Sequence, residues 1–363
     1  MAQANFEISQ LQRGELTELI KFLQLAYPGE VRRTTQRFLS WYFLRNPNIA
    51  GDDLPFWIVR NGDNIVGQLA TIPVWLKVGN SYTKSIWILE FILLEQFRGK
   101  GLGKQLVLAA RDQYPTMLTL GINEASTRVF KSLGWRELGA IHRYHRMLFA
   151  GNAVPRLGNS RALREGLNLL SFPLRRAGVR RKTAGKYQIR RDVSFGPELD
   201  ELWARSSAQW TAAVRRDYDF TAWQFLQQPE KVFDVILLYE QQQLVGYAIL
   251  FFRLGIGKAP APKAAISDIV YDSRNPDEVV DTLVSAALDV AIERKAGSLV
   301  VDILDARVEA SLQNHGFSRI KISPRFMVSS SDFQETLYKP ENWYLTRADS
   351  DISIFEEPNV REA

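Results

Sequence analysis

A glycine-rich segment with flanking cations is the part of this sequence best suited to chemistry. Its residues are Arg98, Gly99, Lys100, Gly101, Leu102, Gly103 and Lys104. The segment follows the apolar run 86–94, which is typical of a strand, and precedes 104–113, which has helical composition. At such a helix start the free amides point toward a ligand, the helix dipole favours negative charge, and glycines let the backbone approach closely. The segment therefore predicts an anion site.

Other chemistries are excluded or disfavoured by residue type. The P-loop ending Gly-Lys-Ser/Thr is absent, and the dinucleotide fingerprint fails because Lys104 stands where its third glycine should be. The chain has no cysteine, which excludes disulfides, a thiolate nucleophile and cysteine-ligated metals. Its three histidines are His142, His145 and His315, and none has the His-Glu-x-x-His spacing. We therefore expect no metal site.

Two motifs together resemble the GNAT superfamily of N-acetyltransferases. The form Arg98-x-x-Gly101-x-Gly103 resembles the family's acyl-CoA pyrophosphate loop. About 20 residues later, Asn123-x-x-Ser-x-x-Val-Phe130-x-x-Leu-Gly-Trp135 looks like the family's Asn-x-x-Ala-x-x-Phe-Tyr-x-x-Leu-Gly-Phe helix and turn. The resemblance covers roughly residues 6–149 and implies that acetyl-CoA is the acyl donor.

The resemblance also implies roles for individual residues. The backbone amides of 98–104 would hold the pyrophosphate of CoA. Leu93 and Leu94 would pair through their backbone with the pantetheine arm, and the amides near them would polarise the thioester carbonyl. Asn123 would reach the pantetheine or thioester region, and it could be a helix N-cap at the same time.

The catalytic acid and base are less well marked. Many relatives carry a tyrosine as proton donor where this chain has Phe130, so either Tyr144 serves or the thiolate leaves with solvent as the acid. Glu90 is the candidate base, because an acid within the apolar strand 86–94 is costly to bury unless it is paired or functional. The alternative for Glu90 is a salt bridge, and Asp268, at the corresponding place of the second half, suggests a duplicated structural acid. Glu124 is a second candidate for the base.

The sequence repeats itself with an offset of 182 residues. Phe38-x-x-Trp-x-Phe-Leu-x-x-Pro47 reappears as Phe220-x-x-Trp-x-Phe-Leu-x-x-Pro229, which predicts a tandem duplication. The glycine loop is not repeated. At the matching turn, Asn275 is expected to cap a helix, Pro276 to occupy its first position and Glu278 to close a capping box, so this half should not bind CoA.

These observations predict an α+β fold of two tandem GNAT-like domains, each a mixed, mostly antiparallel sheet flanked by helices. The expected divisions are a catalytic acyl-CoA-binding domain at 1–150, a basic connector at 151–190, a degenerate GNAT-like domain at 191–345 and an acidic tail at 346–363. The tail segment from Asn342 to Asp351 resembles a motif of GNAT-like proteins associated with bacterial cell-surface polysaccharide formation. It is either a sugar-binding element or a closing strand with a polar tail.

The net charge of +6 is concentrated in 156–191, which holds eleven Lys or Arg and one acid. This segment is either a solvated linker or a patch that binds anionic lipid, a phosphate-rich substrate or nucleic acid. Few aromatic residues are interleaved among its basic residues, which argues against binding of nucleic acid, DNA included. The first ten residues lack a signal pattern, and the apolar stretches are far too short to span a membrane, so a cytoplasmic location is expected.

The expected activity is direct transfer of an acetyl or other acyl group from acyl-CoA to a primary amine, carried by a small molecule or sugar, through a tetrahedral intermediate. One alternative is an aminoacyl-tRNA-dependent transferase on a similar tandem fold, against which the intact glycine loop argues. The other is a non-catalytic module that binds acyl-CoA or a partner at a membrane surface. The acceptor, acyl-chain length and oligomeric state are not encoded by any motif.

Overall fold

The computed structural model describes residues 6–49, 51, 53–153, 160–170, 185–253, 262–321, 324–349 and 354. Contacts between residues divide the chain into two compact units. Unit 1 comprises Met1–Ala140, Gln227–Pro229 and Pro324–Asn342, and unit 2 comprises Ile141–Leu226, Glu230–Ser323 and Trp343–Ala363. Neither unit is a continuous segment of the chain.

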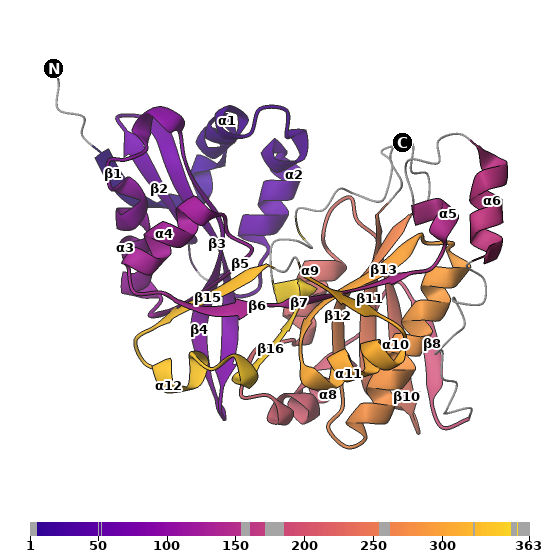
Figure 1. Cartoon of the computed structure of the whole chain (residues 1–363). Coiled ribbons are helices and arrows are strands. Elements are labelled where there is room, and N and C mark those ends of the chain that lie inside the picture. Colours follow the sequence, from indigo (N-terminus) through magenta and orange to yellow (C-terminus); the bar gives the residue numbers. More distant parts are fainter. Residues whose placement is uncertain are drawn as a thin grey trace. The chain divides into compact units, whose positions relative to one another are not determined.

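Unit 1 is a sheet with helices on its faces (Figure 1). Its elements are β1 (Phe6–Gln12), α1 (Leu16–Ala26), α2 (Gln36–Leu39), β2 (Asp53–Asn61), β3 (Asn64–Val78), β4 (Ser81–Leu93), α3 (Leu102–Gln113), β5 (Thr116–Leu120), α4 (Glu124–Ser132), β6 (Arg136–Ala140), β15 (Arg325–Ser330) and α12 (Gln334–Leu337). The strand order is β6-β15-β5-β4-β3-β2-β1, and only the β4–β5 pair is parallel.

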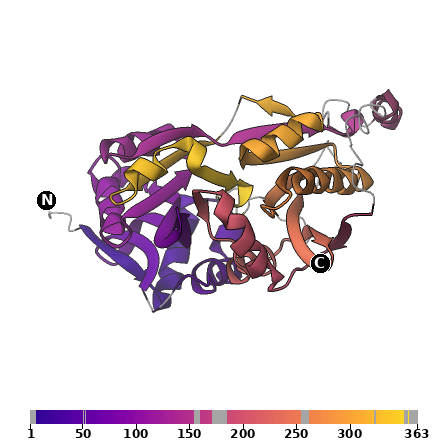
Figure 2. The same ribbon diagram turned by 90° about the horizontal axis from the view of Figure 1, so that it is seen from below.

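Unit 2 repeats this plan. Its elements are β7 (His142–Met147), α5 (Ala150–Ala153), α6 (Arg161–Leu170), β8 (Gln188–Asp192), α8 (Glu198–Ser206), β9 (Ala212–Val214), α9 (Tyr218–Phe225), β10 (Phe233–Glu240), β11 (Gln243–Arg253), β12 (Lys263–Tyr271), α10 (Pro276–Glu293), β13 (Ser298–Leu304), α11 (Ala306–Asn314), β14 (Ser318–Ile320) and β16 (Trp343–Thr346). The order is β14-β7-β13-β12-β11-β10-β8, with β16 added to β13 and β9 to β16. The long α10 lies against the strands of this unit (Figure 2).

The two sheets correspond strand for strand once an exchange of strands is recognised. In unit 1, β15 lies between β5 and β6, although it comes from the end of the chain. In unit 2, β7 lies between β13 and β14, although it precedes both by more than a hundred residues. A duplication predicts this equivalence of order. The divisions expected at residues 150, 190 and 345 remain predictions, whereas the contacts assign β7 to unit 2 and β15 to unit 1.

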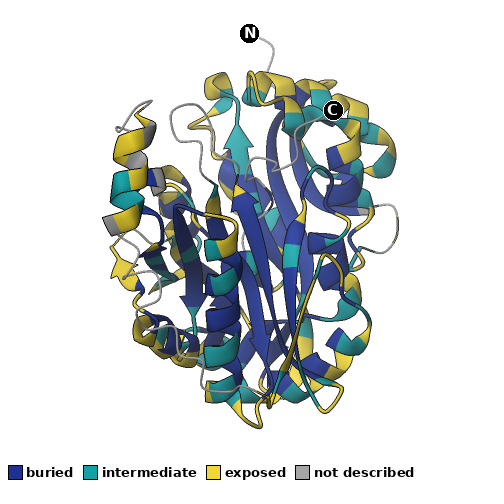
Figure 3. Ribbon diagram, turned by 90° about the vertical axis from the view of Figure 1, so that its right-hand side faces the viewer, coloured by how far each residue is buried: buried dark blue, intermediate teal, exposed yellow. Residues whose placement is uncertain are grey.

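The core of each unit lies between its sheet and its helices. In unit 1 the apolar faces of α3 and α4 pack on the sheet, and Met327 of β15 joins this cluster. The central strands of the units are largely buried (Figure 3). Exposed residues gather on the outer sides of the helices, on the turns and on the outer strands β6, β8 and β14. The expected α+β class with mixed, mostly antiparallel sheets is confirmed. Among the described residues, no helix is both long enough and apolar enough to cross a membrane.

Candidate active site

The glycine loop joins the end of β4 to the start of α3 in unit 1. Gly99 and Gly101 both have φ near +79°, in the left-handed region that favours glycine. Gly101 is the N-cap of α3 and supplies no side chain, so no side-chain cap bonds the amides of the first turn. The start of α3 therefore keeps its donors and its dipole available for an anion.

Positive side chains surround the loop. Arg98 and Lys100 are exposed, as is Lys104 in the first turn of α3. The Nε of Arg98 donates a hydrogen bond to the carbonyl of Leu93 at 3.0 Å, which ties the loop to the end of β4. The Nζ of Lys100 lies 5.3 Å from the ring centre of Phe6, a cation–π distance. The arrangement fits a multiply charged phosphate ligand.

Gly103 has a packing role that its place in the motif does not reveal. It is buried, and a Cβ atom at this position would lie 2.7 Å from Cζ of Phe91. The Phe91 ring in turn stacks on Phe130, with ring centres 5.5 Å apart. Because the backbone of α3 must approach β4 this closely, only glycine fits without displacing the ring.

Strand β4 contains a bulge and then separates from β5. Ala70 of β3 faces Glu90 and Thr71 faces Ile88, so Leu89 is the extra residue of the bulge. The pairing of β4 with β5 covers only Ile86, Trp87 and Ile88. Within the described part of the chain, β4 has no strand partner on its β5 side beyond the bulge, so this edge is open.

Hydrogen bonding shows which groups face this open edge. The amide of Leu94 donates to the carbonyl of Val66 at 3.0 Å, so it is not available to pair with pantetheine or to polarise a thioester. In an antiparallel pair, alternate residues bond to the neighbour, so the backbone groups of Phe91 and Leu93 point away from β3. The backbone direction of Leu93 fits the role expected of it, whereas the Leu94 amide is already engaged; the pantetheine contacts of both residues remain predictions.

Glu90 lies directly after the bulge, on the opposite face of β4 from Phe91. It is 9% exposed, and its Oε2 accepts a hydrogen bond at 3.0 Å from Nε2 of Gln68, which is completely buried on β3. The Glu90 side chain is therefore buried, with at least one hydrogen-bond donor holding its carboxylate. Its role as the base stays a prediction.

Asn123 is the N-cap of α4. Its Oδ1 accepts a hydrogen bond from the amide of Ser126 at 2.9 Å, as the capping alternative requires. Asn123 and the neighbouring Glu124 are exposed. The contribution of Asn123 to ligand binding and that of Glu124 to proton transfer remain predictions.

Phe130 and Tyr144 lie in different units. Phe130 is fully buried in the core of unit 1, and its ring also packs on Trp135. Tyr144 is on β7 in the core of unit 2, where its hydroxyl donates to Glu309 at 2.8 Å and accepts from Gln313 at 3.3 Å. Burial and the Glu309 carboxylate raise the pKa of Tyr144. The Tyr144 hydroxyl is thus engaged by two side chains of unit 2, and its role as the proton donor remains a prediction.

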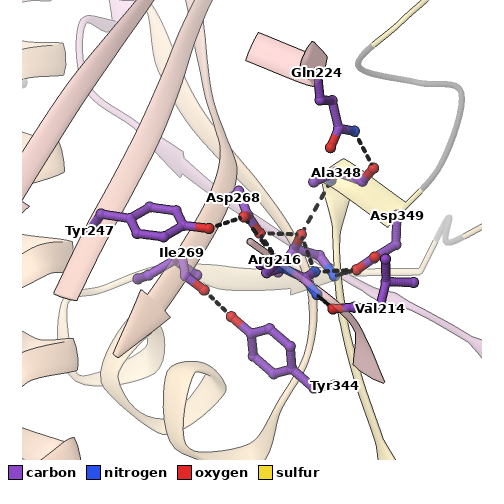
Figure 4. A network of polar contacts seen from close by, with 10 residues as sticks. Val214, Arg216, Gln224, Tyr247, Asp268, Ile269, Tyr344, Ala348 and Asp349 are labelled. Carbon is purple, nitrogen blue, oxygen red and sulfur yellow. Dashed lines mark hydrogen bonds and ion pairs between the residues drawn. The ribbon is translucent and has the colours of Figure 1, made fainter. Parts of the chain in front are cut away.

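In unit 2 the equivalent carboxylate is locked into a buried polar network (Figure 4). Ser267 forms a bulge in β12, and Asp268 follows it. The Nε of Arg216 lies 3.2 Å from Asp268 Oδ1, and the same guanidinium bonds Asp349. Burial raises the pKa of Asp349 to about 6, although the positive charge of Arg216 opposes the shift.

Strand β16 fills the space between β12 and β13. The pairing of β12 with β13 ends at Ile266, and Ile303 and Leu304 of β13 pair instead with β16. The Tyr344 hydroxyl donates to the carbonyl of Ile269 in β12. Trp343 and Tyr344 are both buried. The closing-strand interpretation of the tail is therefore correct for β16, whose aromatic pair is too deeply buried to form a sugar platform. Asp349 lies in the 3₁₀ turn that follows, and Asp351 lies outside the described residues.

The start of α10 differs from the glycine loop. Asn275 and Pro276 occupy the N-cap and first positions as expected, but Asn275 makes no side-chain cap bond. Glu278 bonds the Lys186 ammonium and the Tyr187 hydroxyl, so the expected capping box is wrong. Lys186 belongs to the basic connector. The cations of that connector between 171 and 184 all lie outside the described residues.

Comparison with known proteins assigns the region that contains the glycine loop to a family. Residues 16–135 match the model of the acetyltransferase (GNAT) family. They are a GNAT acetyltransferase family domain. The match includes β4, the glycine loop and the α4 helix, and it supports acyl transfer with acyl-CoA as the donor. No curated protein matches the sequence.

Solved structures share the GNAT fold over most of the chain. A GCN5-related N-acetyltransferase from Anabaena variabilis is 14% identical with a TM-score of 0.59, covering 89% of this chain and 72% of its own. A probable N-acyltransferase from Enterococcus faecalis is 12% identical with a TM-score of 0.61, covering 92% and 74%. N-myristoyltransferase of Saccharomyces cerevisiae with bound myristoyl-CoA is 13% identical with a TM-score of 0.59, covering 91% and 80%. At these identities the likeness concerns the fold.

Two residues next to the candidate site residues escape the sequence motifs. Gln68 is a polar residue within the apolar strand β3, the same signal that singles out Glu90 on β4, and it could have been noticed on that ground. Phe91 carries no sequence signal, because its importance comes from its backbone direction and from its contact with Gly103.

Proposed function

We propose that unit 1 transfers an acyl group, most simply acetyl, directly from acyl-CoA to a primary amine. The observation that carries the proposal is the junction of the open β4 edge with the glycine loop, where Arg98 contacts Leu93. An extended pantetheine can pair with that edge as a strand would, while the amides at the start of α3 bind its pyrophosphate. The GNAT match of residues 16–135 supports the same donor.

In this proposal Glu90 is the base. A primary amine with a pKa near ~10 is mostly protonated at neutral pH and cannot attack until it loses a proton. Glu90 accepts that proton, the amine nitrogen forms a bond to the thioester carbonyl carbon, and the carbon–sulfur bond breaks. The backbone amides of Phe91 and Leu93 are the donors that face the thioester region.

The leaving group needs no acid from the protein. Phe130 has no proton to give, and a thiol with a pKa near ~8.5 is stable enough as a thiolate to depart and to take its proton from solvent. Tyr144 has no part in the proposed reaction, because its hydroxyl bonds Glu309 in unit 2.

We further propose the tandem arrangement expected from the repeat, with unit 2 as a partner that binds no CoA. Three observations support this: β16 fills the space between β12 and β13, Arg216 neutralises Asp268, and Asp277 and Glu278 place negative charge in the first turn of α10. The proposal predicts one acyl-CoA per chain. The buried aromatic pair of the tail gives no ground for a sugar acceptor, so the acceptor is specified only as a primary amine.

Calorimetric titration with acetyl-CoA, free CoA and a longer acyl-CoA tests the donor site. Gly101→Glu should abolish binding, because it puts a carboxylate and a strained left-handed residue where the phosphates dock. Gly79→Glu is the matched control: Gly79 is also an exposed glycine with positive φ and open space around it, at the opposite end of β3 from Gly67 and the loop.

The two variants separate the outcomes. Saturable binding of one acyl-CoA, lost in Gly101→Glu and kept in Gly79→Glu, would support the proposal and justify a screen of amine acceptors. Binding that survives Gly101→Glu would refute the loop assignment. No binding of any CoA species would overturn the proposed function and direct attention to aminoacyl-tRNA donors.

A further inference from the structure

Gln68 is the polar partner of the proposed base. Its side chain is completely buried on β3, and its Nε2 donates to Glu90 Oε2 at 3.0 Å. Gln68 pairs with Ile92 across the sheet and Ala70 pairs with Glu90, so Gln68 reaches Glu90 diagonally. Both residues belong to unit 1 and to its GNAT domain.

The carbonyl oxygen of the Gln68 side-chain amide, Oε1, shows why the amide has this orientation. Among the described atoms, its buried Oε1 has no hydrogen-bond partner. A buried carbonyl oxygen without a partner is unfavourable, because it has lost its hydrogen bonds to water. Turning the amide over would place Oε1 against the carboxylate oxygen of Glu90, where two acceptor oxygens would repel each other and cost more than the unpaired oxygen does. The amide is therefore held in the orientation that serves Glu90, and the unsatisfied oxygen is the consequence.

The same relationship recurs in unit 2 with different side chains. Tyr247 stands on β11 at the place that corresponds to Gln68, and its hydroxyl donates to Asp268 at 2.7 Å. Asp268 also receives hydrogen bonds from Arg216 and from Thr346 Oγ1. A donor from the neighbouring strand thus accompanies the acid after the bulge in both units, although the residue types differ.

We propose that Gln68 is a positioning residue for the base Glu90. Its amide N–H fixes one carboxylate oxygen and stabilises the ionised form, which is the form able to remove a proton from the amine. Gln68 itself does not touch the substrate. This inference rests on the proposed function for its catalytic meaning, while the contact between the two side chains can be tested without any turnover.

The test uses Gln68→Met, which keeps the length of the side chain and removes the donor. The first readout is NMR titration of the Glu90 carboxyl in protein with ¹³C-labelled glutamate, with Glu90→Gln used to assign the signal. The second is the pH profile of kcat/KM for thiol release from acetyl-CoA with an amine acceptor. Gln224→Met is the matched control, because Gln224 is a buried glutamine of unit 2 whose Nε2 bonds the Ala348 carbonyl.

In Gln68→Met we expect the Glu90 titration and the acidic limb of the profile to move to higher pH. We also expect kcat/KM at neutral pH to fall about tenfold, the effect of one lost hydrogen bond to a charged group. The Kd for acetyl-CoA should not change. Gln224→Met should leave both the titration and the profile where they are in the wild type, although it also loses a buried hydrogen bond.

A Glu90 titration unchanged in folded Gln68→Met would overturn the inference. If that variant does not fold, Gln68→Ala, which cannot clash, replaces it with the same expectations. If the wild type neither binds acetyl-CoA nor releases thiol while the Glu90 titration still moves, the proposed function has failed, the contact is confirmed and the positioning role in acyl transfer is refuted. A shifted titration with an unchanged profile would refute the positioning role alone.

Discussion

Glu90 and Asp268 occupy equivalent positions in the two units, each directly after a bulge in the strand that then separates from its parallel neighbour. Their surroundings differ. Glu90 is bonded by the neutral amide of Gln68, whereas Asp268 is bonded by the guanidinium of Arg216. Asp268 thus belongs to a buried ion-pair network, in which it shares the Arg216 guanidinium with Asp349. The proposed base and its counterpart in unit 2 therefore differ in the hydrogen-bond donor that the neighbouring strand supplies, Gln68 for Glu90 and Tyr247 for Asp268.

Glu90→Gln tests the base directly. The substitution keeps the shape of the side chain and removes its ability to accept a proton, so kcat should fall by about 10²–10⁴ while the Kd for acetyl-CoA stays the same. Steady-state kinetics and calorimetry measure the two quantities. Glu7→Gln, at an exposed position on β1, is the control for loss of a carboxylate. Full turnover in Glu90→Gln would remove the assignment.

The contact between Gly103 and Phe91 predicts coupled substitutions. Gly103→Ala should destabilise the protein by about 1–3 kcal/mol, because the new methyl group meets the ring at 2.7 Å. In a Phe91→Leu background the cost should be smaller, since the ring atoms in conflict are gone. Urea denaturation of the single and double variants measures the difference. Gly99→Ala, which has open space around it, should add to Phe91→Leu without coupling; equal costs of Gly103→Ala in both backgrounds would contradict the packing argument.

The sequence allowed the local features of the site to be predicted and left the distant ones hidden. The loop, the start of α3 and the cap at Asn123 depend on residues within a few positions of one another, where glycine conformation and side-chain caps decide the structure. The hydrogen bond that engages the Leu94 amide depends on the register of β4 against the carbonyl of Val66. The place of β15 between β5 and β6 depends on pairing across about 200 residues, for which no local pattern exists.

Asp349 predicts a pH dependence of stability. Its pKa in the folded protein is raised to about 6 from an ordinary 3.8, so between these values the folded state binds more protons than the unfolded state. Its contribution to the unfolding free energy is therefore fully present below pH ~4 and is lost as the pH rises through ~6. Relative to Asp349→Asn, the wild type should gain stability, by about 3 kcal/mol at most, when the pH is lowered from 7 to 4.

Denaturation of both proteins across this pH range measures the change. Losing the contact with Arg216 shifts the unfolding free energy of Asp349→Asn by the same amount at every pH. Only the change of the stability difference with pH reports the titration of Asp349. Asp332→Asn, at an exposed position, should follow the wild type. A difference between wild type and Asp349→Asn that is flat with pH, or that grows toward pH 7, would show that the Asp349 carboxyl does not titrate in this way.

Because of the strand exchange, the core of the GNAT domain includes a residue far outside residues 16–135, and we expect acyl-CoA binding to depend on it. Met327 on β15 is completely buried in the cluster formed by α3, α4 and the sheet of unit 1. Met327→Ala should lower the unfolding free energy by about 2–5 kcal/mol through the cavity it leaves, and it should weaken acetyl-CoA binding by loosening the sheet behind β4. Met147→Ala on β7 is the matched control, because Met147 is half exposed. If the two variants proved equally stable and bound acetyl-CoA equally well, β15 would not be part of the unit 1 core, and the exchange of strands would have to be abandoned.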